Sequence, residues 1–225
     1  MVGMSDKGPA SEGIPVPASV GRALRERRVK AGLSIRQLAT EAGVSASLVS
    51  QIERGKINPS VGRVLSLVTA LGISLDELFV DLDGNAPARP TNDDDTGDVL
   101  HADQRRRIDL ATGVEWQRLT PDHEQGVDFL YVVYEVGGAS CPPGKLMHHD
   151  GREYGLILSG HLGATVGADH FELGPGDSIV FNSEIPHRLW TIGDEPAVGV
   201  WTIIGRDGDR RDPVIRSSTR ERHSA

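Results

Sequence analysis

The segment from Leu33 to Pro59, LSIRQLATEAGVSASLVSQIERGKINP, constrains the fold of this chain more than any other. Apolar residues recur in it at helical spacing, at positions 33, 38, 39, 44, 49 and 52. Gly43 can end a helix in the left-handed conformation without a Cβ clash, and Ser45 can cap the next helix through its side-chain oxygen. Two short helices joined by a glycine turn are typical of the helix-turn-helix motif, which reads DNA.

Residues 20–79 as a whole resemble the phage-repressor (Xre-type) helix-turn-helix family. The matching features are Leu38-Ala39, Gly43-Val44-Ser45, the run Ser50-Gln51-Ile52-Glu53-Arg54-Gly55, Asn58-Pro59-Ser60, Leu71-Gly72-Ile73 and Leu78-Phe79. The resemblance implies a compact bundle of five helices. Serines that can cap these helices stand at positions 19, 34, 45, 60 and 74.

The resemblance also implies where DNA would be contacted, because the second helix of the motif lies in the major groove. The expected base contacts are those of Ser45, Ala46, Ser47, Ser50 and Gln51. The expected phosphate contacts are those of Arg36, Gln37, Arg54, Lys56 and Asn58. Gln51 suits adenine, since its amide can form two hydrogen bonds with that base. Ser45 is equally explained as a helix cap, and Ser47 and Ser50 as ordinary exposed serines. Glu53 would repel DNA, so we expect it to be a structural partner within the bundle.

Charge is distributed unevenly along the chain. The whole chain carries −8, whereas residues 19–80 hold nine Lys and Arg against five Asp and Glu, a local charge of +4. The remaining residues therefore carry −12. Such asymmetry is typical of a DNA-binding domain, here residues 19–80, tied to an acidic partner domain.

The segments outside the predicted domains are polar. We expect residues 1–18 to be disordered, residues 81–100 to be an acidic linker and residues 207–225 to be a flexible tail. Cys141 is the only cysteine, so no intrachain disulfide can form, which favours a cytoplasmic, reducing compartment. The sequence contains no apolar run long enough to cross a membrane, and we expect no membrane partner.

Residues 101–206 follow a different pattern. Short runs rich in Val, Ile and aromatic residues alternate with Gly, Pro and Asp, which is typical of a β-sandwich or barrel. Eight of these runs predict strands, at residues 114–119, 127–136, 154–158, 162–166, 170–173, 178–181, 188–191 and 197–204.

Two motifs in this region resemble those of the cupin family. The first is His149-Asp150-Gly151-Arg152-Glu153 with Gly160, and the second is Gly174-Pro175-Gly176-Asp177 followed by Ile185-Pro186-His187. The resemblance implies a double-stranded β-helix, or jelly-roll barrel. The chain is then a multidomain α + β protein, with an N-terminal five-helix helix-turn-helix bundle and a C-terminal cupin sensor domain. The resemblance also implies metal ligands at His149, Glu153 and His187.

Met147 stands where the family usually carries a further ligand histidine. A thioether suits Cu(I) better than the harder divalent ions common in cupins. The sequence therefore favours a pocket for a small organic effector without a metal cofactor, and a divalent metal held by His149, Glu153 and His187 remains the alternative. The expected pocket residues are His149, Glu153, His187, Tyr131 and Trp190, with Tyr134, Trp116 and Arg152 as further candidates.

Together the two domains predict a DNA-binding transcriptional regulator without enzymatic activity. Its expected partners are a double-stranded DNA operator and a small-molecule effector. One helix-turn-helix reads too few bases for useful selectivity, so we also expect a homodimer. The alternative is a metal-dependent cupin enzyme, of the oxygenase or isomerase type, fused to a DNA-binding domain, and Met147 in a ligand position counts against it.

Overall fold

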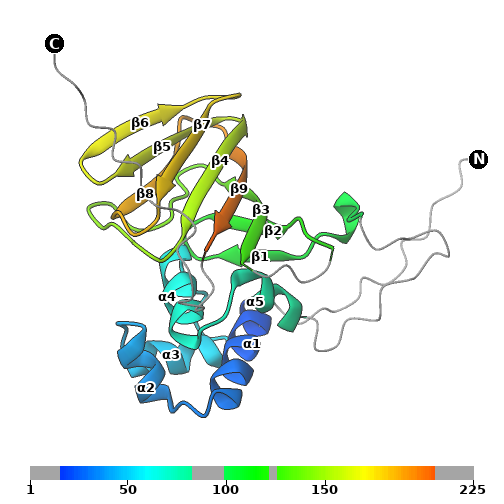
Figure 1. Cartoon of the computed structure of the whole chain (residues 1–225), viewed down its shortest axis with the longest axis vertical. Helices are drawn as coiled ribbons and strands as arrows, with labels where there is room; N and C mark the ends of the chain where they lie inside the picture. Colours follow the sequence, from blue (N-terminus) through cyan, green and yellow to red (C-terminus); the bar gives the residue numbers. More distant parts are fainter. Residues whose placement is uncertain (1–15, 83–98, 122–125, 206–225) are drawn as a thin grey trace, which may run out of the picture.

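The computed structural model describes residues 16–82, 99–121 and 126–205, which form a helical bundle and a β-barrel (Figure 1). The helices are α1 (Val16–Lys30), α2 (Ile35–Glu41), α3 (Ala46–Glu53), α4 (Val61–Leu71), α5 (Leu75–Asp81) and the 3-10 helix η1 (Ala102–Gln104). The strands are β1 (Arg107–Leu110), β2 (Val114–Arg118), β3 (Val127–Tyr134), β4 (Arg152–Ser159), β5 (His161–Val166), β6 (Asp169–Leu173), β7 (Ser178–Asn182), β8 (His187–Ile192) and β9 (Ala197–Ile204). Most of the expected disordered terminus, linker and tail lies outside the described residues.

Serine side chains cap three of the helices at the predicted positions. Ser34 and Ser74 each form a capping box, in which the serine oxygen accepts a hydrogen bond from the backbone three residues later. The side-chain oxygen of Ser45 accepts from the N–H of Leu48 at 3.2 Å. The start of α1 differs from the expectation, since the helix begins at Val16 and not at Ser19. Pro17 is compatible with this earlier start because a first helical turn needs no proline N–H.

One buried ion pair joins α1 to the end of α3. The Arg28 guanidinium donates from Nε to Glu53 Oε1 at 2.6 Å and from Nη2 to Glu53 Oε2 at 2.8 Å. Its Nη1 donates to the carbonyl of Leu33 at 2.8 Å. This geometry agrees with the prediction that Glu53 serves the bundle.

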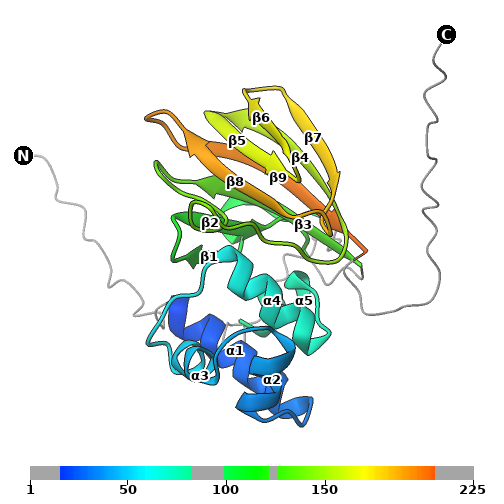
Figure 2. The ribbon, with the colours of Figure 1, turned by 90° about the vertical axis from the view of Figure 1, so that its left-hand side faces the viewer.

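The barrel consists of two antiparallel sheets. The larger sheet has the strand order β1-β2-β3-β9-β4-β7, and the smaller has the order β6-β5-β8 (Figure 2). Buried residues alternate with exposed ones along β3, β4, β8 and β9, which places one face of each strand in the barrel core. Strand β1 was not among the predicted strands, because its four residues contain only Ile108 and Leu110 as an apolar pair.

The helical bundle packs against one end of the barrel, an arrangement that the sequence did not predict. In both views α4 and α5 lie next to the barrel, and α2 and α3 lie on the far side (Figures 1 and 2). Val61 and Leu65 of α4 are almost fully buried and share a cavity with side chains from the barrel. The two predicted domains therefore touch one another.

Buried polar contacts between α5 and the barrel fix the relative position of the two domains. Asp76 of α5 accepts hydrogen bonds from Arg118 Nη2 at 3.0 Å and from the Thr120 hydroxyl at 2.7 Å. The N–H of Asp76 donates to Asp128 Oδ1 at 3.0 Å. Arg118, Asp76 and Asp128 are each at most 3% exposed. A buried and fully paired carboxylate of this kind favours one relative position of two surfaces over others.

Candidate functional site

The helix expected to read DNA lies on the side of the bundle that faces away from the barrel (Figure 1). Ser47, Arg54 and Lys56 are exposed, and Ser50 and Gln51 are half-buried. Gln51 Nε2 donates to the Ser47 hydroxyl at 3.0 Å, and the Arg54 guanidinium donates to the Ser50 hydroxyl. Hydrogen bonds between exposed groups contribute little net stability, so these side chains can exchange them for contacts with DNA.

Other expected DNA contacts have structural partners in the bundle or the barrel. Gln37 and Ser45 complete the caps of α2 and α3, and Ala46 packs against the core. Asn58 Nδ2 donates to the carbonyl of Asp109 in β1 at 2.9 Å. Asn58 therefore belongs to the interface between the bundle and the barrel, and we leave it out of the proposed DNA contacts.

Two neighbouring residues of the first motif, His149 and Glu153, meet the distant His187 inside the barrel. Glu153 of β4 lies beside His149, which precedes that strand, and beside His187, the first residue of β8. Glu153 Oε1 is 3.0 Å from His149 Nε2 and 3.3 Å from His187 Nε2. The three residues are 2%, 6% and 0% exposed in the same order. Their potential ligand atoms lie within 4.8 Å of one another.

The second ring nitrogen of each histidine, Nδ1, indicates which tautomer the neutral ring adopts. His149 Nδ1 lies 3.0 Å from the carbonyl of Asp150, and His187 Nδ1 lies 2.9 Å from the carbonyl of Ile185. A carbonyl can only accept, so Nδ1 of each imidazole carries a proton. In the neutral form of the ring, Nε2 then directs a lone pair at Glu153 Oε1, and none of these three buried atoms has a hydrogen bond of normal geometry among the described residues.

Burial and neighbouring groups act in opposite directions on the pKa of Glu153 and on the pKa of His187. Burial alone raises the pKa of Glu153, but His149, His187 and the indole N–H of Trp201 outweigh burial and lower that pKa below its usual value. Burial lowers the pKa of His187, although Glu153 opposes this shift. Glu153 is therefore an anion that faces a neutral His187.

Trp201 of β9 orients the carboxylate. Its Nε1 donates to Glu153 Oε2 at 2.7 Å, which leaves Oε1 for the histidines. The indole reaches that position by lying across Gly155, its partner in the register of β4 and β9. A Cβ atom at Gly155 would be 2.3 Å from the Trp201 ring, so only glycine leaves room for this contact.

The cluster opens onto a small cavity at the end of the barrel next to α4. Its volume is about 20 Å³. It is lined by Val61, Leu65, Trp116, Leu130, Val132, Tyr134, Met147, His149, Glu153, Leu189, Trp201 and Ile203. Met147 exchanges two backbone hydrogen bonds with His187, at 2.9 and 2.8 Å, so it lies beside the cluster as the sequence resemblance implied.

The structure does not bring Tyr131 and Trp190 to this cavity. The Arg105 guanidinium carbon lies over the Tyr131 ring, 5.2 Å from the ring centroid. The Arg188 guanidinium carbon lies over the Trp190 ring in the same way, at 4.8 Å. Tyr134 and Trp116, two of the three further candidates, line the cavity instead, whereas Arg152 does not. The period of a strand could have given this result, because Trp190 is three residues from inward-facing His187 and so points outward.

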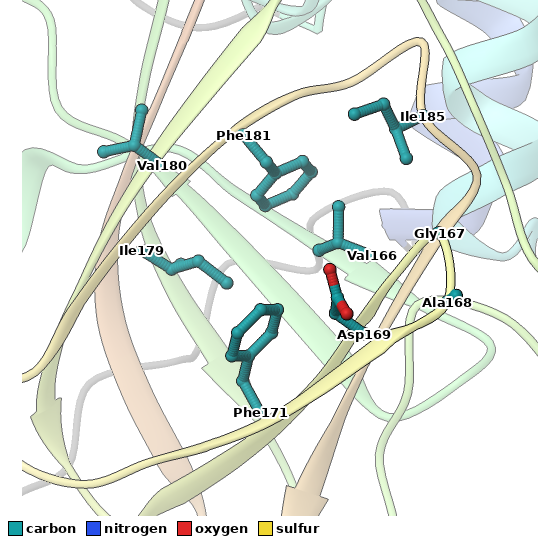
Figure 3. A pocket seen from close by; sticks show the side chains of 9 residues that line it. All are labelled: Val166, Gly167, Ala168, Asp169, Phe171, Ile179, Val180, Phe181 and Ile185. Atoms are coloured by element: carbon teal, nitrogen blue, oxygen red, sulfur yellow. The ribbon is translucent and has the colours of Figure 1, made fainter. Parts of the chain in front are cut away.

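A second hollow lies between β6 and β7, an edge strand of each sheet. It has a volume of about 290 Å³ and is lined by Val166, Gly167, Ala168, Asp169, Phe171, Ile179, Val180, Phe181 and Ile185 (Figure 3). Asp169 is the only charged side chain among these residues. Phe181 connects the hollow to the cluster, since its ring centroid is 5.0 Å from that of His187. None of the three cluster side chains lines the hollow, so it offers little for specific recognition.

Two protein families match separate segments of the chain. The helix-turn-helix family matches residues 24–78, and the cupin domain family matches residues 128–203. No helix among the described residues is long and apolar enough to cross a membrane.

Individual relatives extend these matches across the chain. The HTH-type transcriptional regulator PuuR of Escherichia coli K12 is 27% identical over 82% of this chain and 91% of its own length. The uncharacterized HTH-type transcriptional regulator y4mF of Sinorhizobium fredii is 35% identical over 29% of this chain and 86% of its own length. The crystal structure of an HTH_3 family transcriptional regulator from Vibrio cholerae superposes with a TM-score of 0.61 and 20% identity, over 84% of this chain and 97% of that one.

Proposed function

Since this chain belongs to the helix-turn-helix transcriptional regulators and carries a cupin domain, we propose that the barrel senses a ligand at His149, Glu153 and His187 and thereby controls DNA binding. The observation that carries this proposal is the convergence of two imidazole lone pairs and a carboxylate oxygen in a buried site. Burying unpaired polar atoms costs about 1–3 kcal/mol each. Apolar side chains at these positions would fill the barrel without this cost.

The three ligand atoms suit a divalent cation. Neutral imidazole nitrogen and carboxylate oxygen bind zinc, iron, nickel and similar ions, and each Nδ1 already donates to a carbonyl that orients its ring. A bound cation would neutralise Glu153 and give all three atoms a partner. This is the alternative that the sequence left open, and the orientation of the rings favours it over a site without a metal.

We assign no catalytic step to the barrel. PuuR, which aligns with 82% of this chain, is a transcriptional regulator by name, and apart from the cluster and Tyr134 the cavity is lined mainly by apolar side chains. A bound ion would offer an open position to an organic effector, which would then be recognised through its own oxygen or nitrogen donors.

For DNA reading we propose that Gln51, Ser47 and Ser50 contact base edges and that Arg54 and Lys56 contact phosphates. A homodimer would place two copies of α3 in successive major grooves of a pseudo-palindromic operator. The position of α3 on the side of the bundle away from the barrel, together with the exposure of Ser47, Arg54 and Lys56, supports this assignment.

The test of DNA reading starts with selection of the bound sequence from fragmented genomic DNA. Gln51→Ala should then lower affinity for the selected operator by roughly 1–3 kcal/mol and affect random DNA much less. Arg54→Ala should weaken both and reduce the slope of log K against log salt by about 0.9. Equal losses on operator and random DNA for Gln51→Ala would remove that residue from the reading set.

The test of sensing uses the same operator. Purified protein is stripped with a chelator, and operator affinity is measured before and after addition of Zn²⁺, Ni²⁺ or Fe²⁺. His149→Gln should remove any response to the ion, whereas His148→Gln should keep it, because exposed His148 lies outside the cluster. A response that survives in His149→Gln would contradict the assignment of the ligand site.

A further inference from the structure

Helix α4 of the DNA-binding domain forms part of the wall of the barrel site. Val61 and Leu65 line the same cavity as His149 and Glu153. Gly62 faces Met147, since a Cβ atom built on Gly62 would lie 3.6 Å from both Cβ and Sδ of Met147. A helix of the proposed DNA-reading domain thus covers the side of the cluster formed by His149 and Glu153.

The size of the cavity decides what can occupy it in this arrangement. Its volume of about 20 Å³ is close to the roughly 10–15 Å³ that one water molecule needs. Pockets that bind small organic ligands have volumes of about 300–1,000 Å³. The packed arrangement therefore admits a metal ion or a water molecule and excludes an organic molecule.

The polar contacts between the two domains lie at α5 and at the segment before α4. Besides the Asp76 network, they include the N–H of Ala111 donating to Pro59 at 3.0 Å and Asn58 donating to Asp109. Asn58 and Pro59 lie just before Ser60, the N-cap of α4, so these bonds anchor the end of the helix that lines the cavity. Interfaces between domains of one chain resemble transient protein interfaces, and relative motion is their usual behaviour.

We propose that α4 is the lid of the barrel site, so that an organic effector reaches His149, Glu153 and His187 only when the helical bundle separates from the barrel. Effector binding and the packed arrangement then exclude one another. A ligand that binds one of two arrangements shifts the equilibrium toward it by its difference in affinity. The inference rests on the proposed function, and it adds that the DNA-binding domain itself forms a wall of the ligand site.

The direction of the response follows from the position of α3. In the packed arrangement α3 faces away from the barrel, so the bundle can bind DNA while it covers the site (Figure 2). Packing also fixes the bundle relative to the barrel, which lowers the entropy lost when a dimer binds two half-sites. Separation of the domains should therefore lower operator affinity, and an organic effector should release DNA.

A disulfide between the two domains tests the lid directly. Gly62→Cys and Met147→Cys would place two Cβ atoms about 3.6 Å apart, within the range of about 3.5–4.5 Å found in disulfides. The pair is made in a Cys141→Ser background, so that the buried native thiol cannot compete. The oxidised form of this variant, with the disulfide, is then the locked form. The reduced form, with the same sequence, is the unlocked form.

Access is measured with diethyl pyrocarbonate, an organic reagent that acylates neutral imidazole, followed by peptide mass spectrometry. We expect acylation of His149 and His187 to be at least about tenfold slower in the oxidised protein, since locking removes a minor open state. Acylation of exposed His148 should be equal in both forms. Equal rates at His149 and His187 in both forms would overturn the proposal and point to entry from the second hollow beside Phe181.

A second pair of variants avoids the disulfide. Gly62→Ala adds a Cβ at ordinary contact distance from Met147 and should leave His149 and His187 protected. Gly62→Glu adds a longer, charged side chain against the apolar wall and should raise their acylation severalfold. If Gly62→Glu left both histidines as protected as Gly62→Ala does, α4 would not be the lid.

Operator binding separates this inference from the proposed function. The locked form should bind the selected operator at least as tightly as the reduced form, and Gly62→Glu should bind it several times more weakly than Gly62→Ala. Tighter binding by Gly62→Glu would reverse the proposed direction and contradict the coupling. Loss of all DNA binding in the unlocked parent would instead contradict the function on which the inference rests.

Discussion

Two buried glutamates with different surroundings distinguish the bundle from the barrel. Glu53 meets the Arg28 guanidinium through two hydrogen bonds, so its charge is compensated within its own domain. Glu153 meets Trp201 on one oxygen and two imidazole nitrogens on the other, and among the described residues neither Lys nor Arg forms an ion pair with it. The charge of Glu53 is therefore neutralised by the protein itself, whereas the charge of Glu153 would be neutralised by an added proton or a bound cation.

The largest difference between the two sites should appear when a charge partner is removed. Arg28→Met leaves Glu53 buried without a cation, and breaking a buried pair in this way costs about 3–5 kcal/mol. Urea unfolding of the full chain should show this loss. The double variant Arg28→Met with Glu53→Leu should recover much of it, and no recovery would mean that packing, not charge, dominates at this position.

Addition of a divalent ion should stabilise the barrel and leave the Glu53 site unaffected. An ion at 100 times its Kd raises the free energy of unfolding by about 2.7 kcal/mol if it binds only the folded state. The measurement is the melting temperature of chelator-treated protein with and without Zn²⁺ or Ni²⁺. His149→Gln should abolish the shift and His148→Gln should retain it. An equal shift in both variants would place the ion elsewhere.

Substitution of Glu153 by Gln should change the free energy of unfolding by less than Arg28→Met does, and in the direction of higher stability. In metal-free protein, Glu153→Gln keeps an oxygen for Trp201 and turns an NH2 group toward the two Nε2 lone pairs. One new hydrogen bond contributes about 1 kcal/mol, so the variant should be as stable as the parent or slightly more stable. Urea unfolding in the presence of chelator measures it. A loss of several kcal/mol would indicate that the imidazoles are protonated donors.

The smallest expected effect is the pH dependence of the metal-free barrel. Because the pKa of His187 is lowered in the folded state, the unfolded chain binds more protons just below the ordinary histidine pKa of about 6.5. Stability should therefore fall as pH decreases below that value. His187→Gln should reduce this dependence when unfolding is followed from pH 7 to pH 5.5. An unchanged slope would assign the dependence to other groups.

The helical half of the molecule follows from short stretches of sequence. Ser34, Ser45 and Ser74 cap helices at the predicted places, because capping depends on the few residues that follow each serine. The start of α1 was misplaced for the same local reason, since Ser19 looks like a cap although Pro17 fits the first helical turn. The alternation of inward and outward side chains along a strand is equally local. From it, the sequence could have predicted that Trp190 points away from the barrel interior.

The sequence by itself therefore determined two domains, their folds and the three residues His149, Glu153 and His187. Only the tertiary structure decided which atoms of those residues face one another, because the ring orientations depend on the carbonyls of Asp150 and Ile185. It also placed α4 over the cluster and Asn58 against β1. Contacts between surfaces far apart in the chain depend on the shape and charge of both, and these are not encoded in the periodicity of either segment.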